Sequence, residues 1–136
     1  MSHFGPPVAA ATSNDPLFRL RAYQIAADLL KTAWLDAKML SDDSVTREIA
    51  GQLYAAVGSI SANIGEGYSR SSGVDRSRLF EYALGSVRES MTWYNAARPI
   101  LGDIVLTRLN DLEEIRRILL AVIPRERARR TRLQKQ

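Results

Sequence analysis

Apolar residues recur at helical spacing along most of this chain. In the first apolar segment they step by three and four residues, which is the spacing of a heptad seam, at Leu20, Tyr23, Ala27, Leu30, Trp34 and Ala37. Asp15 is the expected N-cap of this helix, and Pro16 fits its first position because a proline there loses no hydrogen bond. The pattern predicts a first helix that begins at Asp15.

Three further segments have the same period. Their apolar stripes are Ile49, Leu53, Ala56, Ile60, Asn63 and Gly67; then Leu79, Ala83, Val87 and Met91; then Val105, Leu109, Leu112, Ile115, Leu119 and Val122. We expect breaks at 41–44 and at Gly73, a cap at Asp75, and an end or a kink at Pro124. No segment alternates with the period of a half-buried strand. The sequence predicts an all-α protein, packed as an antiparallel up-down-up-down four-helix bundle.

The chain of 136 residues is expected to form one domain with two distinct ends. Residues 1–14 are interpreted as a disordered leader rather than a signal peptide, because they lack a basic start and two prolines interrupt their apolar stretch. The bundle is expected over 15–123, followed by a basic tail over 124–136. No apolar run reaches the roughly 18 residues of a membrane span, and cysteine is absent. We therefore expect a cytoplasmic protein without a membrane partner.

Charge is concentrated at the C-terminus. The net charge of the chain is +4, yet residues 124–136 alone contain six cations and one anion. Cations at this density neutralise phosphates and release counterions when they bind RNA or DNA. The predicted nucleic-acid-binding residues are Arg125, Arg127, Arg129, Arg130, Arg132 and Lys135. With little to bury, this tail is expected to be loose or marginally helical.

Most enzyme motifs are missing. His3 is the sole histidine and lies in the leader, which argues against a histidine-based triad and against zinc or di-iron sites that need histidine. The glycine-rich stretch 65–73 matches neither a phosphate-binding loop nor a dinucleotide fingerprint. We expect no catalytic residue, no metal and no cofactor.

Polar residues interrupt the apolar faces of the second and third helices, at Asn63, Glu66, Ser86 and Glu89. As a carboxylate pair, Glu66 and Glu89 could bind a metal or act as acid and base. The alternative is a buried hydrogen-bonded cluster that fixes the register of the two helices, with nearby arginines as partners. We favour the structural interpretation, because the set contains no histidine and no third carboxylate.

The strings SISANIGEG (59–67) and ALGSVRE (83–89) carry a family resemblance. Over residues 17–123 the chain resembles bacterial four-helix-bundle proteins first noticed as reading frames in intervening sequences of 23S rRNA genes. Their motifs are close to SI-x-ANIAEG and ALGS-xx-E. Here Gly65 replaces the usual alanine, and the stretch 69–82 is more basic than in the family. The resemblance implies an antiparallel four-helix bundle, often assembled as a homopentameric ring. It also implies a relation to accessory proteins of diversity-generating retroelements, which are basic pentamers that bind nucleic acid and a reverse transcriptase.

Self-association is also expected from the residues themselves. Trp93 and Tyr94 are adjacent, so both cannot point into one core, and the apolar surface left over favours another copy of the chain. The leading hypothesis is a non-catalytic, oligomeric protein associated with RNA or DNA. The alternative is a scaffold or accessory subunit that recruits a partner protein, and a carboxylate metalloenzyme is the third and least favoured hypothesis.

Overall fold

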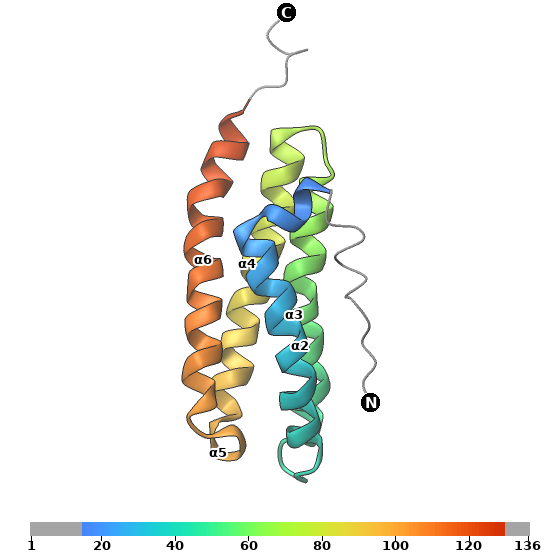
Figure 1. The fold of residues 1–136 in the computed structure, drawn as a ribbon, viewed down its shortest axis with the longest axis vertical. Helices are drawn as coiled ribbons and strands as arrows, with labels where there is room; N and C mark the ends of the chain where they lie inside the picture. The colour runs from blue at the N-terminus through green and yellow to red at the C-terminus, as the bar shows by residue number, and fades with distance from the viewer. Residues whose placement is uncertain (1–14, 130–136) are drawn as a thin grey trace, which may run out of the picture.

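The structure, a computed structural model, describes residues 15–129, and all regular secondary structure in that range is helical (Figure 1). The elements in chain order are the 3-10 helix η1 (Pro16–Arg19) and the α-helices α2 (Arg21–Ser41), α3 (Arg47–Tyr68), α4 (Gly73–Ala96), α5 (Arg98–Leu101) and α6 (Ile104–Ala128). The all-α class predicted from the sequence is therefore confirmed.

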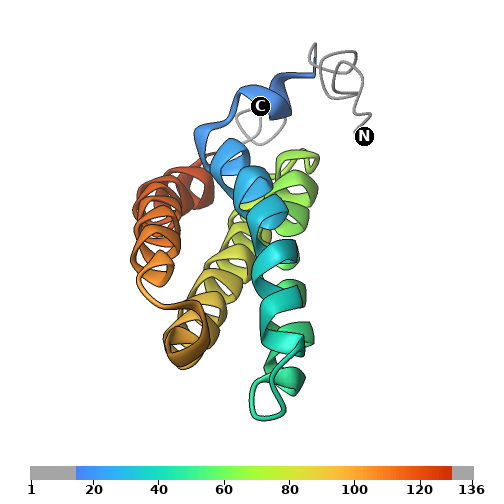
Figure 2. The same ribbon diagram turned by 60° about the horizontal axis from the view of Figure 1, so that its bottom comes forward.

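Four of the α-helices are long, and each lies beside the next. Helix α2 packs on α3, α3 on α4 and α4 on α6, while α6 also contacts α2. The link 42–46 and the short helix α5 lie at one end of the molecule, and the link 69–72 lies at the other (Figure 1). The same neighbours remain side by side in the rotated view of Figure 2. This arrangement lets one face of every long helix contribute to a common interior.

That interior is apolar. The largest fully buried side chains come from all four long helices: Leu29, Leu40, Leu53, Val57, Ile60, Ile64, Val87, Tyr94, Val105, Leu112, Ile115 and Leu119. Burying one such side chain stabilises the fold by about 1.5 to 3 kcal/mol before entropy is counted. The stripes predicted for α3, α4 and α6 supply most of this set.

The inward face of α2 differs from the predicted heptad seam. Its buried residues are Ala22, Ile25, Ala26, Leu29, Ala33, Asp36 and Leu40. The seam residues are at best half-buried, and Trp34 is 49% exposed, with the Lys38 ammonium 4.9 Å from its ring. The physical reason is size: the small alanines allow neighbouring helices to approach closely, and the larger side chains cover the edges of that contact.

The start of α2 was also predicted too early. Asp15 does act as a cap, but its carboxylate accepts a hydrogen bond from the Leu17 N–H and opens the separate element η1. Leu20 is extended and divides η1 from α2, which begins at Arg21.

Gly73 does not end α3, as had been predicted, but opens α4. Helix α3 ends at Tyr68, and the cap of α4 is Ser72, whose hydroxyl accepts from the Asp75 N–H. Gly73 is buried, and a Cβ at this position would collide with the Glu126 carbonyl oxygen of α6. The glycine is needed for a close approach of two helices rather than for a turn.

Candidate nucleic-acid interface

Helix α6 continues past Pro124, which was predicted to end or kink it, and runs to Ala128. A proline inside a helix costs about 3 kcal/mol, because it removes a backbone hydrogen bond and its ring crowds the preceding turn. Contacts with the rest of the protein offset this cost. Ile123 is buried in the core, and the backbone of Glu126 lies against Gly73.

Three of the six predicted phosphate-binding cations fall within the described residues. Arg125 and Arg127 lie in the last turn of α6, Arg129 follows as its C-cap, and all three are exposed. The predicted tail is therefore helical over 124–128, where a loose or marginally helical segment had been expected. The remaining three cations, Arg130, Arg132 and Lys135, lie outside the described residues.

Two of these arginines already have acidic neighbours. An Arg127 Nη lies 2.9 Å from a Glu81 carboxylate oxygen, and the Arg129 Nε lies 3.4 Å from Glu126. Between residues 15 and 129, Arg125 has no carboxylate within ion-pair distance. Exposed ion pairs contribute at most about 1 kcal/mol. Phosphates of a nucleic acid can therefore replace these carboxylates at low cost.

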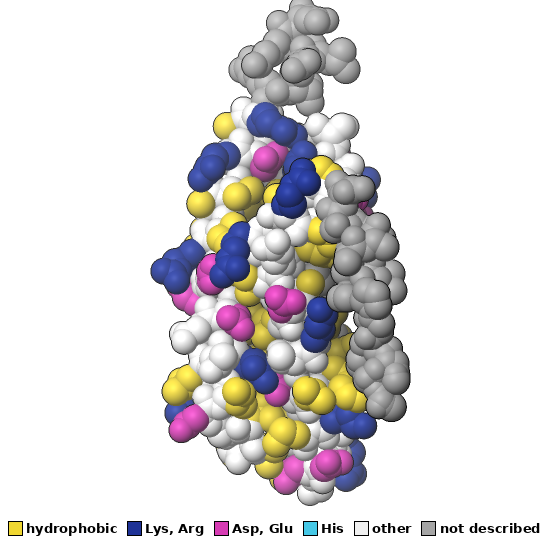
Figure 3. All heavy atoms as spheres, viewed as in Figure 1, with side chains coloured by type: hydrophobic (Ala, Val, Ile, Leu, Met, Phe, Trp, Pro, Cys, Tyr) yellow, Lys and Arg dark blue, Asp and Glu magenta, His cyan; other side chains and the backbone are white. Residues whose placement is uncertain are grey.

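Further arginines lie at the same end of the molecule, where α3 ends and α4 begins (Figure 1). Arg70 pairs with Glu66 at 2.7 Å, and Arg78 pairs with Asp75 at 3.4 Å. Figure 3 shows Lys and Arg side chains around this end on the face in view. We call this surface the basic end and define it by Arg70, Arg76, Arg78, Arg125, Arg127 and Arg129.

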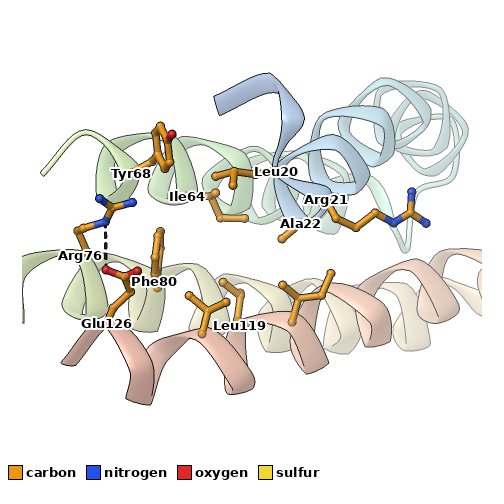
Figure 4. A pocket seen from close by; sticks show the side chains of 11 residues that line it. Leu20, Arg21, Ala22, Ile64, Tyr68, Arg76, Phe80, Leu119 and Glu126 are labelled. Carbon is orange, nitrogen blue, oxygen red and sulfur yellow. Dashed lines mark ion pairs between the residues drawn. The ribbon is translucent and has the colours of Figure 1, made fainter. Parts of the chain in front are cut away.

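An apolar crevice lies next to the basic end, where the start of α2 faces α6 (Figure 4). Its volume is about 200 Å³, and side chains from four helices line it. The lining residues are Leu20, Arg21, Ala22, Ile64, Tyr68, Arg76, Phe80, Ile118, Leu119, Val122 and Glu126. Most are aliphatic or aromatic, so the walls of the crevice are apolar.

One end of the crevice is polar. The Arg76 Nε lies 3.3 Å from Glu126 Oε1, and the two side chains are 16% and 18% exposed. Neither atom has a hydrogen-bond partner among the described residues, although both atoms are buried. The Arg76 guanidinium also lies 5.0 Å from the centre of the Tyr68 ring (Figure 4). The crevice thus combines apolar walls with a buried ion pair whose two facing atoms make no hydrogen bond among the described residues.

The predicted polar cluster between the second and third helices is not buried in the chain. Glu66 and Glu89 are both exposed. Glu66 pairs with Arg70 one turn away, and Glu89 accepts a hydrogen bond of 3.1 Å from the Trp93 indole N–H. Each carboxylate finds a partner four residues along its own helix, so neither needs the facing helix.

The other two members of that cluster also bond within their own helices. The Asn63 amide donates to the Ser59 carbonyl at 2.8 Å, and the Ser86 hydroxyl donates to the Tyr82 carbonyl at 3.2 Å. Both residues are half-buried. The spacing of the four predicted residues places them on one face of each helix. That face lies at the side of the molecule and does not point into the interior.

A buried polar network does exist at the opposite end of the molecule, and the sequence pattern did not reveal it. The Asp36 carboxylate on α2 accepts hydrogen bonds from the Tyr94 hydroxyl on α4 and the Arg108 guanidinium on α6, each at 2.7 Å. Asp36 is 3% exposed and Tyr94 is fully buried. A usable signal was the placement of Asp36 three residues after Ala33, on the alanine stripe that faces inward.

This network raises the pKa values of two of its members, Tyr94 and Arg108. Burial raises the pKa of the Tyr94 hydroxyl far above its ordinary value, and the hydrogen bond to Asp36 adds to the shift. The hydrogen bond to Asp36 also raises the pKa of Arg108. The three groups come from α2, α4 and α6, so the arrangement is suited to fixing these helices relative to one another.

Two further observations concern the alternatives raised by the sequence. Within residues 15–129, no three His, Cys, Asp or Glu side chains gather closely enough to hold a metal ion. The helices of that range are too short or too polar to cross a membrane.

Comparison with known proteins completes the description. No curated protein matches the chain. A solved structure from Bacteroides thetaiotaomicron, described as a protein of unknown function from the S23 ribosomal protein family, superposes with a TM-score of 0.70. It shares 21% sequence identity, and the match covers 75% of this chain and 97% of that one, which shows a common fold. The family model of the 23S rRNA-intervening sequence proteins matches residues 19–121. Because that match spans most of the chain and agrees with the motifs at 59–67 and 83–89, the protein belongs to the family of 23S rRNA-intervening sequence proteins.

Proposed function

We propose that this protein is a non-catalytic, antiparallel up-down-up-down four-helix bundle that associates with nucleic acid, RNA in the first place, through its basic end and C-terminal segment. The family description, which refers to 23S rRNA, is consistent with this proposal. Phosphate contacts position a protein without reading sequence. We therefore expect weak sequence preference.

The observation that supports the proposal best is the convergence of arginines from the link 69–72, from α4 and from the end of α6 on one end of the molecule. The carboxylates between them lie in exposed or partly exposed ion pairs, which hold the guanidinium groups in place without neutralising all of them. In the sequence, three more cations, Arg130, Arg132 and Lys135, follow the end of α6. Short-range attraction to a polyanion is strongest where fixed cations are grouped in this way.

The test is the salt dependence of binding to a short single-stranded RNA, measured by fluorescence anisotropy. For single strands, log K falls with log salt at about −0.7 for each neutralised phosphate. Replacing Arg125, Arg127 and Arg129 by glutamine should reduce the magnitude of that slope by about 2. The control is a triple variant with the same charge change, Lys38→Gln, Arg47→Gln and Arg98→Gln, on residues away from the basic end, which should leave the slope unchanged.

Truncation gives an independent measurement. A chain that stops after Arg129 retains all of α6 and loses Arg130, Arg132 and Lys135, so it should bind more weakly with its helix content intact. If both variants bind like the full chain, the basic end is not the interface. If the full chain shows no binding even at low salt, the proposed function itself is wrong.

We also propose that the protein is an oligomer, with five copies as the resemblance implies. Exposed apolar side chains on α2 and α3 support self-association: Trp34, Leu35, Met39 and Tyr54. Several basic ends in one assembly would convert modest affinity into avidity. The same surface also fits the alternative function, a scaffold that recruits a partner protein.

A further inference from the structure

We propose that the crevice beside the basic end receives one unpaired base of a single-stranded nucleic acid. This inference rests on the proposed function and adds to it the form of nucleic acid that is preferred. Phosphate contacts alone do not distinguish single strands from duplexes, whereas a pocket for a base does, because the bases of a duplex are stacked and paired.

The crevice has the size and the lining to hold a base. The crevice measures about 200 Å³, and an apolar cavity of about 150 Å³ is large enough to bind benzene. Phe80 and Tyr68 provide aromatic walls, and Leu119 lies across from Leu20 (Figure 4). Val122 also lines the crevice. Unpaired bases are commonly held between aromatic and aliphatic side chains or against the plane of an arginine.

The polar end of the crevice offers both a donor and an acceptor to a ligand. Arg76 Nε and Glu126 Oε1 face each other as an ion pair at 3.3 Å, but neither atom makes a hydrogen bond among the described residues. A buried polar atom without a hydrogen bond is unfavourable, so a ligand that bonds to both atoms is favoured. The Watson–Crick edge of every base places a donor next to an acceptor, and carboxylates accept readily from base amino groups. A purely aliphatic ligand would give neither atom a hydrogen bond, which favours a base over a lipid chain.

Arginines lie on the surface around the crevice. Arg21 lines the crevice, and Arg129 lies 3.4 Å from the Glu126 oxygen at the polar end. Both guanidinium groups are largely exposed, with Arg21 paired to Glu114 at 2.9 Å. A nucleotide whose base enters the crevice would therefore have arginines on either side for its flanking phosphates. This arrangement matches the general design of single-strand binding sites, in which cations follow the backbone and side chains hold the bases.

The test compares three probes of equal length against the full chain at one salt concentration: a 12-nucleotide single strand, the same strand without bases, and a duplex of the same sequence. We expect the natural single strand to bind about tenfold more tightly than the abasic strand, which has the same phosphates. It should also bind more tightly than the duplex. Equal affinity for all three probes would overturn the inference and leave the proposed function standing, whereas no binding of any probe would overturn both.

A variant that fills the crevice provides the matched structural test. Val122→Trp should lower affinity for the natural strand about tenfold, to the level of the abasic strand, while the salt dependence stays the same. Leu120→Trp is the control, because Leu120 lies on the same helix, is 42% exposed and does not line the crevice. Ile118→Trp is a second crevice variant should Val122→Trp fail to give the circular dichroism spectrum of the parent. If both folded crevice variants bind the natural strand as the parent does, the base does not enter the crevice.

Discussion

Asp36 illustrates how a single residue can determine the packing of three helices. It is the one buried carboxylate among residues 15–129, and it accepts hydrogen bonds from partners on α4 and α6. A buried charge is tolerated only where partners of this kind surround it. Because Tyr94 and Arg108 meet at Asp36, a shift of α2 along its axis by one turn would leave a charge unpaired. The network therefore contributes to a unique register.

Asp36→Ala should destabilise the fold by about 3 to 5 kcal/mol, because it leaves the partly buried Arg108 guanidinium without a counter-charge. Glu89→Ala is the matched control, a carboxylate that the sequence pattern had placed inside but that is exposed. It should change the free energy of unfolding by less than about 0.5 kcal/mol. Urea titrations of both variants provide the measurement. Equal stability of the two variants would show that the Asp36 network contributes nothing.

The raised pKa of Tyr94 predicts a specific pH dependence. In the unfolded chain this hydroxyl ionises near its ordinary pKa of about 10, whereas the folded state retains the proton. Deprotonation therefore favours unfolding, so the stability contributed by Tyr94 is intact below pH 10 and falls as pH rises above it, by about 1.4 kcal/mol per unit. Tyr94→Phe should be less stable near neutral pH but should lose less stability between pH 10 and 11. A parallel decline of parent and variant would contradict the assignment.

At the scale of elements, the contact of α4 with α6 depends on Gly73. Gly73→Ala would place a methyl group against the Glu126 backbone, so it should destabilise the protein by about 1 to 3 kcal/mol and loosen the last turn of α6. Gly85→Ala on the same helix meets nothing within 4 Å and should instead stabilise by about 0.5 to 1 kcal/mol. Thermal melts of the two variants should therefore shift in opposite directions. A rise in both melting temperatures would mean that the two helices can separate freely.

The four long helices follow from periodicity, and their stripes on α3, α4 and α6 lie where the spacing places them. The periodicity does not predict which face of α2 is buried, because two adjacent stripes of that helix are both apolar. Which of the two stripes is buried depends on how closely the neighbouring helices approach α2. Likewise, local sequence marks Pro124 as a helix end, and only the packing of Ile123 and Glu126 against distant residues shows why the helix continues. At the candidate site, the cations were visible in the sequence, but the crevice arises from four separate segments.

At the scale of the whole molecule, the distribution of surface side chains separates two regions. The basic end groups six arginines, and the exposed apolar side chains Trp34, Leu35, Met39 and Tyr54 lie on α2 and α3, away from it. Contiguous apolar surface of this kind is typical of contacts between proteins. The separation lets one surface bind other copies of the chain while the other remains open to nucleic acid.

Self-association follows from this separation and can be measured directly. The chain has a mass of 15.2 kDa, and light scattering at micromolar concentration should give about five times that value if the ring implied by the resemblance forms. Leu35→Glu combined with Met39→Glu should shift the mass toward that of one chain, because a charge buried at an interface without a partner is unfavourable. Val45→Glu is the control, since Val45 lies in a connecting link and is 86% exposed. A parent chain that scatters as a single copy would contradict self-association. A double variant that retains the parent mass would place the interface on another face.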